Sequence, residues 1–131
     1  MKSHYTIALI VLLTTSSMAG DIASSYKQAA ALGDAQERER ATRIYGQIDL
    51  MPYYQQKYSP VFQSCLKATV PPDTTPFSFV AAIGADGRVL RLYTDHETGV
   101  FTCARQTLQK DEFPRPPLSP YYMHVSINFS K

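Results

Sequence analysis

The fold of this chain is decided by the stretch Phe77-Ser-Phe-Val-Ala-Ala-Ile-Gly-Ala-Asp-Gly-Arg-Val-Leu-Arg-Leu-Tyr93. Its first half alternates in the way expected of a strand with one buried face. Gly84-Ala-Asp-Gly87 then supplies a turn, because glycine and aspartate tolerate the positive φ angles that tight hairpins require. The chain returns from Val89 onward. We therefore predict a β-hairpin.

Three further elements follow the hairpin. Residues from Thr98 to Lys110 have the apolar spacing of a short helix, and Thr94-Asp-His-Glu97 before them resembles a capping box. Phe113-Pro-Arg-Pro-Pro117 is a stiff connector. From Tyr121 to Phe129 the residues alternate cleanly, which predicts a strand whose apolar face meets the helices and whose polar face meets water or a partner. The order is β-β-α-β.

Upstream of the hairpin the sequence predicts helices. The stretch from Asp21 to Leu32 is weakly patterned, and we interpret it as a frayed helix or a disordered lead that Gly33 breaks. A helix should then begin at Asp34, with Glu37 as its capping-box partner. Pro52 should end or kink that helix.

A tyrosine-rich join, Pro52-Tyr-Tyr-Gln-Gln-Lys-Tyr58, comes next. We expect these rings to cover the edge of a core, with a ligand platform as the alternative. Ser59-Pro60 has the form of a helix start, and Cys65 belongs to the apolar stripe of that helix. Val70-Pro-Pro-Asp-Thr-Thr-Pro76 cannot continue a helix and predicts an extended linker.

The first 19 residues have the pattern of a cleaved secretory signal. Lys2 is the positive start, Ile7 to Leu13 is the apolar run, and the small residues up to Ala19 predict cleavage before Gly20. The run is too short for a spanning helix, which needs about 20 residues; a retained anchor is the alternative. We expect an exported, periplasmic protein of residues 20–131, without stable membrane insertion.

Composition narrows the partners. Once Lys2 is removed, 12 basic and 11 acidic residues remain. This balance argues against nucleic acid or an anionic membrane, because both select a basic patch. We expect residues 20–76 to form a helical region and linker and residues 77–131 to form the β-β-α-β unit, together one folded domain of α+β class.

The chain has two cysteines, Cys65 and Cys103. In an exported protein an even number favours a disulfide. A redox pair usually has C-x-x-C spacing, and a zinc site needs more ligands than two cysteines. After cleavage the only histidines left are His96 and His124. We therefore predict a structural disulfide and neither a metal nor a cofactor.

The block from Phe77 to Phe129 resembles the C-terminal domain of the TonB family. The resemblance rests on Gly84-Ala-Asp-Gly-Arg-Val89, the helix through Leu108, Phe113-Pro114 and the closing strand. It implies one or two helices packed on a small antiparallel sheet. TonB itself captures an extended segment of a receptor with an edge strand. By this resemblance the implied partner-binding residues are those of the closing strand: Tyr121, Tyr122, Met123, His124, Val125, Ser126, Ile127, Asn128 and Phe129. No charged residue lies among them to guard an exposed edge.

This chain also differs from the energy-transducing relatives of TonB. Those proteins carry a retained membrane anchor and a long proline-rich spacer, which the pattern of this sequence does not predict. Cys65 and Cys103 are not part of the general family pattern. The fold implied by the resemblance is therefore better supported than the activity.

No catalytic motif is evident in the sequence. Asp95-His96-Glu97 is the densest polar cluster, and we interpret it as part of a helix cap. His124 is expected to be a solvated side chain. The first functional hypothesis is a non-catalytic protein-binding or assembly module that uses its sheet edge. The alternatives are an inhibitor or immunity-type protein that blocks a toxic enzyme through Phe113 to Tyr122, and a small hydrolase that uses His96 or His124.

Overall fold

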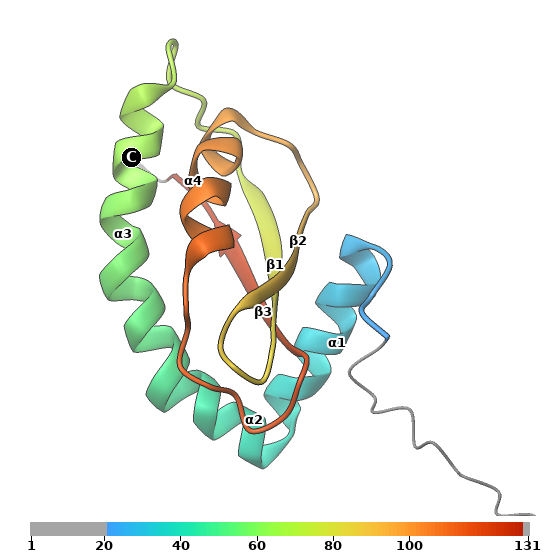
Figure 1. The fold of residues 1–131 in the computed structure, drawn as a ribbon. Helices are drawn as coiled ribbons and strands as arrows, with labels where there is room; N and C mark the ends of the chain where they lie inside the picture. The colour runs from blue at the N-terminus through green and yellow to red at the C-terminus, as the bar shows by residue number, and fades with distance from the viewer. Residues whose placement is uncertain (1–20, 130–131) are drawn as a thin grey trace, which may run out of the picture.

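The computed structural model describes residues 21–129, which form an α+β fold (Figure 1). Its antiparallel sheet has three strands in the order β2-β1-β3. Helices cover both faces of the sheet. In chain order the elements are α1 (Tyr26–Arg38), α2 (Arg40–Ile44), the π-helical turn η2 (Tyr45–Leu50), α3 (Met51–Ala68), β1 (Phe77–Ile83), β2 (Val89–Thr94), α4 (Gly99–Lys110) and β3 (Tyr121–Ile127).

The predicted hairpin and closing strand are present, and together they make the sheet. β1 lies at its centre, where Ala81 pairs with Leu92 of β2 on one side and with Met123 of β3 on the other. Gly87 has a φ of 87° in the turn. Its N–H donates a hydrogen bond to the carbonyl oxygen of Gly84, and its carbonyl oxygen accepts one from the N–H of Phe113. β3 pairs with β1 alone and ends at Ile127, two residues earlier than predicted.

The alternation of β1 produces two cores. Phe79 and Ala81 point to the layer of α3 and α4, where they pack with Tyr58 and Phe101 in the larger core. The opposite face of the sheet buries a smaller core, and its members are Ala23, Ala29, Val80, Ala82, Tyr93 and Tyr122. The expectation that the polar face of β3 meets water or a partner is wrong at Tyr122 and His124, which α1 covers, whereas Ser126 on the same face is exposed.

Helix α1 occupies the stretch expected to be frayed or disordered. Ser25 caps it by accepting a hydrogen bond from the N–H of Gln28. The predicted start at Asp34 is wrong, since that residue lies inside the helix. Gly33 does not break α1 but lets it approach β3. A Cβ at this position would lie 2.7 Å from the carbonyl oxygen of Tyr122.

From α2 to the end of α3 the chain is helical throughout (Figure 1). Pro52 does not end the helix, because the wider π turn immediately before it relieves the clash that a proline ring makes with the preceding turn. Pro60 does not start one. It lies inside α3 on the exposed face of the helix, where the carbonyl group that lacks an N–H partner is accessible to solvent. The tyrosine-rich join is therefore part of α3.

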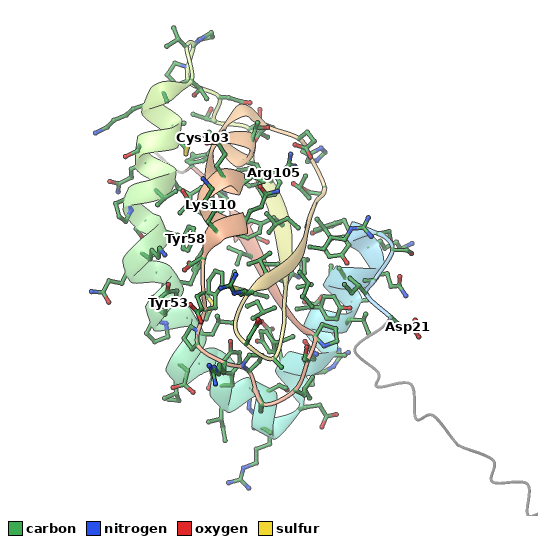
Figure 2. The ribbon with its side chains drawn as sticks, in the orientation of Figure 1. Asp21, Tyr53, Tyr58, Cys103, Arg105 and Lys110 are labelled. Atoms are coloured by element: carbon green, nitrogen blue, oxygen red, sulfur yellow. A yellow bond between two sulfur atoms is a disulfide. The ribbon has the colours of Figure 1, made fainter. Side chains whose placement is uncertain are left out.

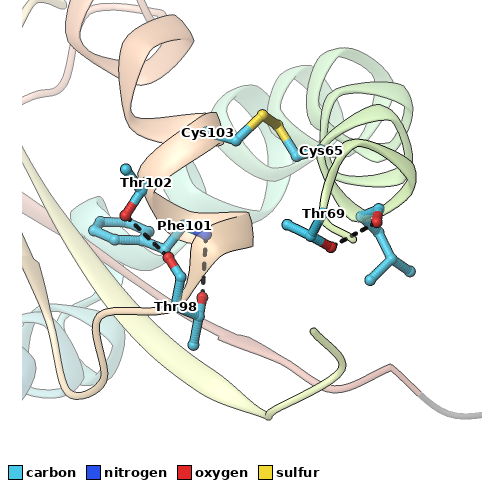
Figure 3. Close-up of a disulfide and its surroundings, with 7 residues drawn as sticks. Cys65, Thr69, Thr98, Phe101, Thr102 and Cys103 are labelled. Atoms are coloured by element: carbon cyan, nitrogen blue, oxygen red, sulfur yellow. Dashed lines mark hydrogen bonds between the residues drawn. A yellow bond between two sulfur atoms is a disulfide. The ribbon is translucent and has the colours of Figure 1, made fainter. Parts of the chain in front are cut away.

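The disulfide prediction is confirmed. Cys65 of α3 and Cys103 of α4 are bonded, with their Cα atoms 5.6 Å apart (Figure 3). Helix α4 lies where predicted, but the capping box at Thr94 is wrong. Thr98 is the cap, and its hydroxyl accepts a hydrogen bond from the N–H of Phe101 at 3.1 Å. The hydroxyl of Thr94 instead bonds the main-chain carbonyls of Ser78 in β1 and of His96 in the bend before α4.

Candidate functional site: the outer edge of strand β3

The path of the chain defines the surroundings of the β3 edge. α1 lies on one face of the sheet and α3 on the other, so the short connection through α2 and η2 must cross from one face to the other. It does so beside the start of β3, where the ring of Tyr45 in η2 packs edge-on against that of Tyr121, with 4.9 Å between the ring centroids. The hydroxyl of Tyr45 in η2 donates to the carbonyl oxygen of Pro114 at 2.7 Å, which fastens this crossing to the connector before β3.

Gln36 closes the start of the edge. Its side-chain nitrogen donates to the carbonyl oxygen of Pro120 at 3.0 Å, and its side-chain oxygen accepts from the N–H of Tyr122 at 2.8 Å. The carboxamide thus makes the two bonds that a neighbouring strand would make. The carbonyl oxygen of Tyr122 is covered by the backbone of α1 at Gly33. The first two residues of β3 are therefore guarded by the protein itself.

The second half of the edge is open. Along β3 the main-chain N–H and C=O groups of successive residues point alternately toward β1 and away from it. Since the N–H of Tyr122 points away from β1, those of His124 and Ser126 do so as well. Within residues 21–129, no side chain bonds to either N–H. The main chain from His124 to Asn128 is the part of the predicted partner-binding strand that can accept another strand.

A cavity of about 200 Å³ lies beside this edge. β3 contributes Tyr121, Met123 and His124 to its lining. We call it the β3-edge cavity, because it touches both helical layers and must therefore lie beyond the unpaired side of β3. The helical residues that line it are Glu37, Arg43, Gly46, Gln47, Leu50 and Met51.

His124 holds α1 against the sheet. Its Nδ1 lies 2.9 Å from a carboxylate oxygen of Asp34, and its Nε2 lies 3.0 Å from the hydroxyl of Tyr26. Burial raises the pKa of the Tyr26 phenol, and a hydrogen bond with Ser78 partly opposes that increase. The expectation of a solvated His124 is wrong, since its side chain is 20% exposed and bonded at both nitrogens.

The serine beside this network belongs to the open edge. The hydroxyl of Ser126 lies 2.9 Å from that of Ser78. The structure thus gathers an acid, a histidine, a phenol and two hydroxyls on one face of the sheet. Asp34 and Tyr26 both come from α1, so the arrangement explains how that helix is oriented on the strands.

A second polar cluster joins α3 to the segment after α4. Asp111 accepts hydrogen bonds from Tyr53 at 2.6 Å, from Tyr58 at 2.7 Å and from Lys57 at 2.7 Å; both tyrosines project from α3 (Figure 2). Burial by itself raises the pKa of Asp111, but these bonds and the N–H of Glu112 hold it below its ordinary value. Burial and the bond to Asp111 raise the pKa of Tyr58. The cluster fixes the start of the connector to β3.

The other residues considered from the sequence are not brought into the site. His96 is exposed in the bend before α4. Phe113 is buried, as are Tyr121 and Tyr122 at the far end of the connector, whereas Arg115, Pro117 and Leu118 in the middle of the predicted inhibitory loop are exposed. Across residues 21–129, no group of three or more histidine, cysteine, aspartate or glutamate side chains is arranged to hold a metal ion. No helix in the same range is long and apolar enough to cross a membrane.

The sequence analysis identified neither the hydrogen bonds of Gln36 at the start of β3 nor the β3-edge cavity. Gln36, Leu50 and Met51 have no individual signature, because their role depends on how α1 crosses to α3. Gly33 and Gly46 did carry a signal, since an isolated glycine inside a helical pattern often marks a close approach. A Cβ on Gly46 would lie 2.9 Å from the hydroxyl of Tyr121.

Comparison of this chain with family models, with curated proteins and with solved structures found no match. The resemblance to the TonB family therefore stays a prediction from the sequence.

Proposed function

We propose that this protein is a non-catalytic, exported protein-binding module that captures an extended segment of a partner along the outer edge of β3. The observation that carries the proposal is the open main chain from His124 to Asn128, next to a stretch that Gln36 already pairs. Strand addition draws its affinity from main-chain hydrogen bonds, so it needs no catalytic or charged signature.

The contrast between the two halves of the edge supports this proposal. Proteins usually guard an exposed edge with charge, proline or a covering segment. Here Gln36 and Gly33 guard the first two residues of β3, whereas Ser126 and Asn128 are exposed and uncharged. An edge protected along only half its length is suited to pairing with a partner over the other half.

Two proline variants of adjacent residues test the proposal. The N–H of Ser126 points outward, so Ser126→Pro removes a bond to the partner and leaves the sheet paired. The N–H of Val125 points to β1, so Val125→Pro removes a ladder bond. We expect the first variant to keep the far-ultraviolet circular dichroism of the parent, and the second to lose stability.

The capture experiment uses immobilised residues 20–131 and a periplasmic extract. The parent should retain a partner that the Ser126→Pro protein does not retain. That partner, once purified, should shift the amide resonances of His124 and Ser126. Undiminished capture by a folded Ser126→Pro protein would contradict the proposed function.

A further inference from the structure

The β3-edge cavity is too small for most ligands but large enough for one side chain. Small-molecule sites usually occupy about 300–1,000 Å³, whereas an enclosed apolar cavity of about 150 Å³ is enough for a benzene ring. The volume here is about 200 Å³. Leu50, Met51 and Met123 line the cavity, and we call these three apolar side chains its floor. Leu50 and Met123 are buried, and Met51 is partly buried.

The position of the cavity fixes which residue of an added strand would reach it. Side chains directly opposite each other on paired strands lie on the same face of the sheet. Met123 points to the face covered by α3 and α4, and it lines the cavity. The side chain of a partner residue opposite Met123 would therefore enter the same space.

The charges around the cavity restrict the partner further. Glu37 stands on the α1 wall and Arg43 on the α2 wall, and within residues 21–129 neither forms an ion pair. A charged anchor would be attracted by one wall and repelled by the other, and it would lose its hydration over the apolar floor. An uncharged anchor meets neither penalty.

We infer that the segment captured at the β3 edge carries one large, uncharged apolar side chain, such as leucine, methionine or phenylalanine, which fills the β3-edge cavity opposite Met123. This inference rests on the proposed function and names the partner it selects. The main chain from His124 onward gives affinity for any extended segment, and the cavity gives specificity for one side chain of that segment.

The test begins with a displayed library of random 12-residue peptides selected on residues 20–131. A selected peptide is then synthesised with leucine, alanine, lysine or aspartate at its anchor, which is the residue whose methyl protons are closest to Met123 by nuclear Overhauser effects. Burying a leucine side chain favours binding by about 10- to 100-fold, so alanine should weaken binding by that factor. Lysine and aspartate should weaken it at least as much.

A matched pair of protein variants separates the cavity from the edge. Gln47 is exposed and lines the cavity, whereas Gln55 is exposed on α3 and does not line it. Gln47→Phe should fill the cavity and bring the leucine-to-alanine affinity ratio close to one, while peptide binding still shifts the amides of His124 and Ser126. Gln55→Phe should leave the ratio unchanged.

The possible outcomes distinguish a failure of the cavity inference from a failure of edge capture. Peptides that shift the amides of His124 and Ser126 but show no preference at the anchor, or a ratio unaffected by Gln47→Phe, would overturn the cavity inference and leave edge capture intact. Peptides that bind elsewhere, or a library that yields none, would count against edge capture itself. Concentration-dependent dimers with shifts at Ser126 would show that a second copy occupies the edge and would also overturn the inference.

Discussion

Reducing the disulfide should lower the free energy of unfolding substantially, because the cross-link closes a long loop and so restricts the unfolded chain. Cys65 and Cys103 are 38 residues apart, and the loop between them contains the linker and the hairpin. In the chain-entropy treatment a loop of this length contributes about 4 kcal/mol. A domain of this size has a total stability of about 5–15 kcal/mol, so the loss is a large fraction of it.

The assay is urea unfolding of residues 20–131 with and without a phosphine reductant. Reduction changes no side chain other than the cysteines, so the difference isolates the cross-link. The midpoint should fall, and the denaturant dependence should rise because the reduced unfolded chain is less compact. The melting temperature should fall by about 15 °C or more.

The control is a protein with both Cys65→Ala and Cys103→Ala, which should be insensitive to the reductant. A change below about 1 kcal/mol on reduction of the parent would refute the reasoning. It would mean that α3 and α4 stay associated in the unfolded state or that the pairing is absent in solution.

Three further perturbations test the packing around the β3 edge and its connector. Gly33→Ala should destabilise the protein by about 1–3 kcal/mol in thermal melts, because the added Cβ meets the carbonyl oxygen of Tyr122. At an exposed helical glycine the same change stabilises the protein, so a gain in stability would refute the close approach. Gln36→Ala should lower the opening free energy of the Tyr122 amide by about 1 kcal/mol in hydrogen exchange, with the Val125 amide as the unchanged control. Asp111→Asn should cost about 2 kcal/mol at neutral pH, since it weakens charge-assisted bonds to a buried carboxylate. The pKa of Asp111 is lowered by folding, so the stability that its carboxylate contributes is present above an unfolded pKa of about 3.9 and is lost as the pH falls through the folded value. The difference in unfolding free energy between parent and variant should therefore close in acid, and a constant difference would refute this assignment.

The strands could be predicted from the sequence because their pattern is local. Alternation from Phe77 and from Tyr121 reflects burial on the larger core, and the turn at Gly87 needs a positive φ that glycine supplies. The pairing of Cys65 with Cys103 was predicted from the number of cysteines and from the compartment that the sequence led us to expect. These features depend on a few neighbouring residues or on a count, so tertiary packing did not alter them.

The helical half depended on contacts that no local pattern reveals. Gly33 and Pro52 were interpreted as breaks, yet one permits close packing on Tyr122 and the other follows a π turn. The polar residues on the second face of β3 suggested solvent, but His124 is bonded to α1. The β3-edge cavity arises where α1 crosses to α3, so it could not be predicted before that crossing was known.

If β3 captures a partner strand, its main chain beyond Tyr122 is open in the free protein and paired in the complex. The most direct measurement is residue-specific amide hydrogen exchange of residues 20–131, alone and with a bound peptide or partner. The amides of His124 and Ser126 should exchange rapidly in the free protein and become protected on binding, while those of Met123 and Val125, which face β1, should be protected in both states. Protection of His124 and Ser126 in the free protein, or rapid exchange that persists in the complex, would contradict the account.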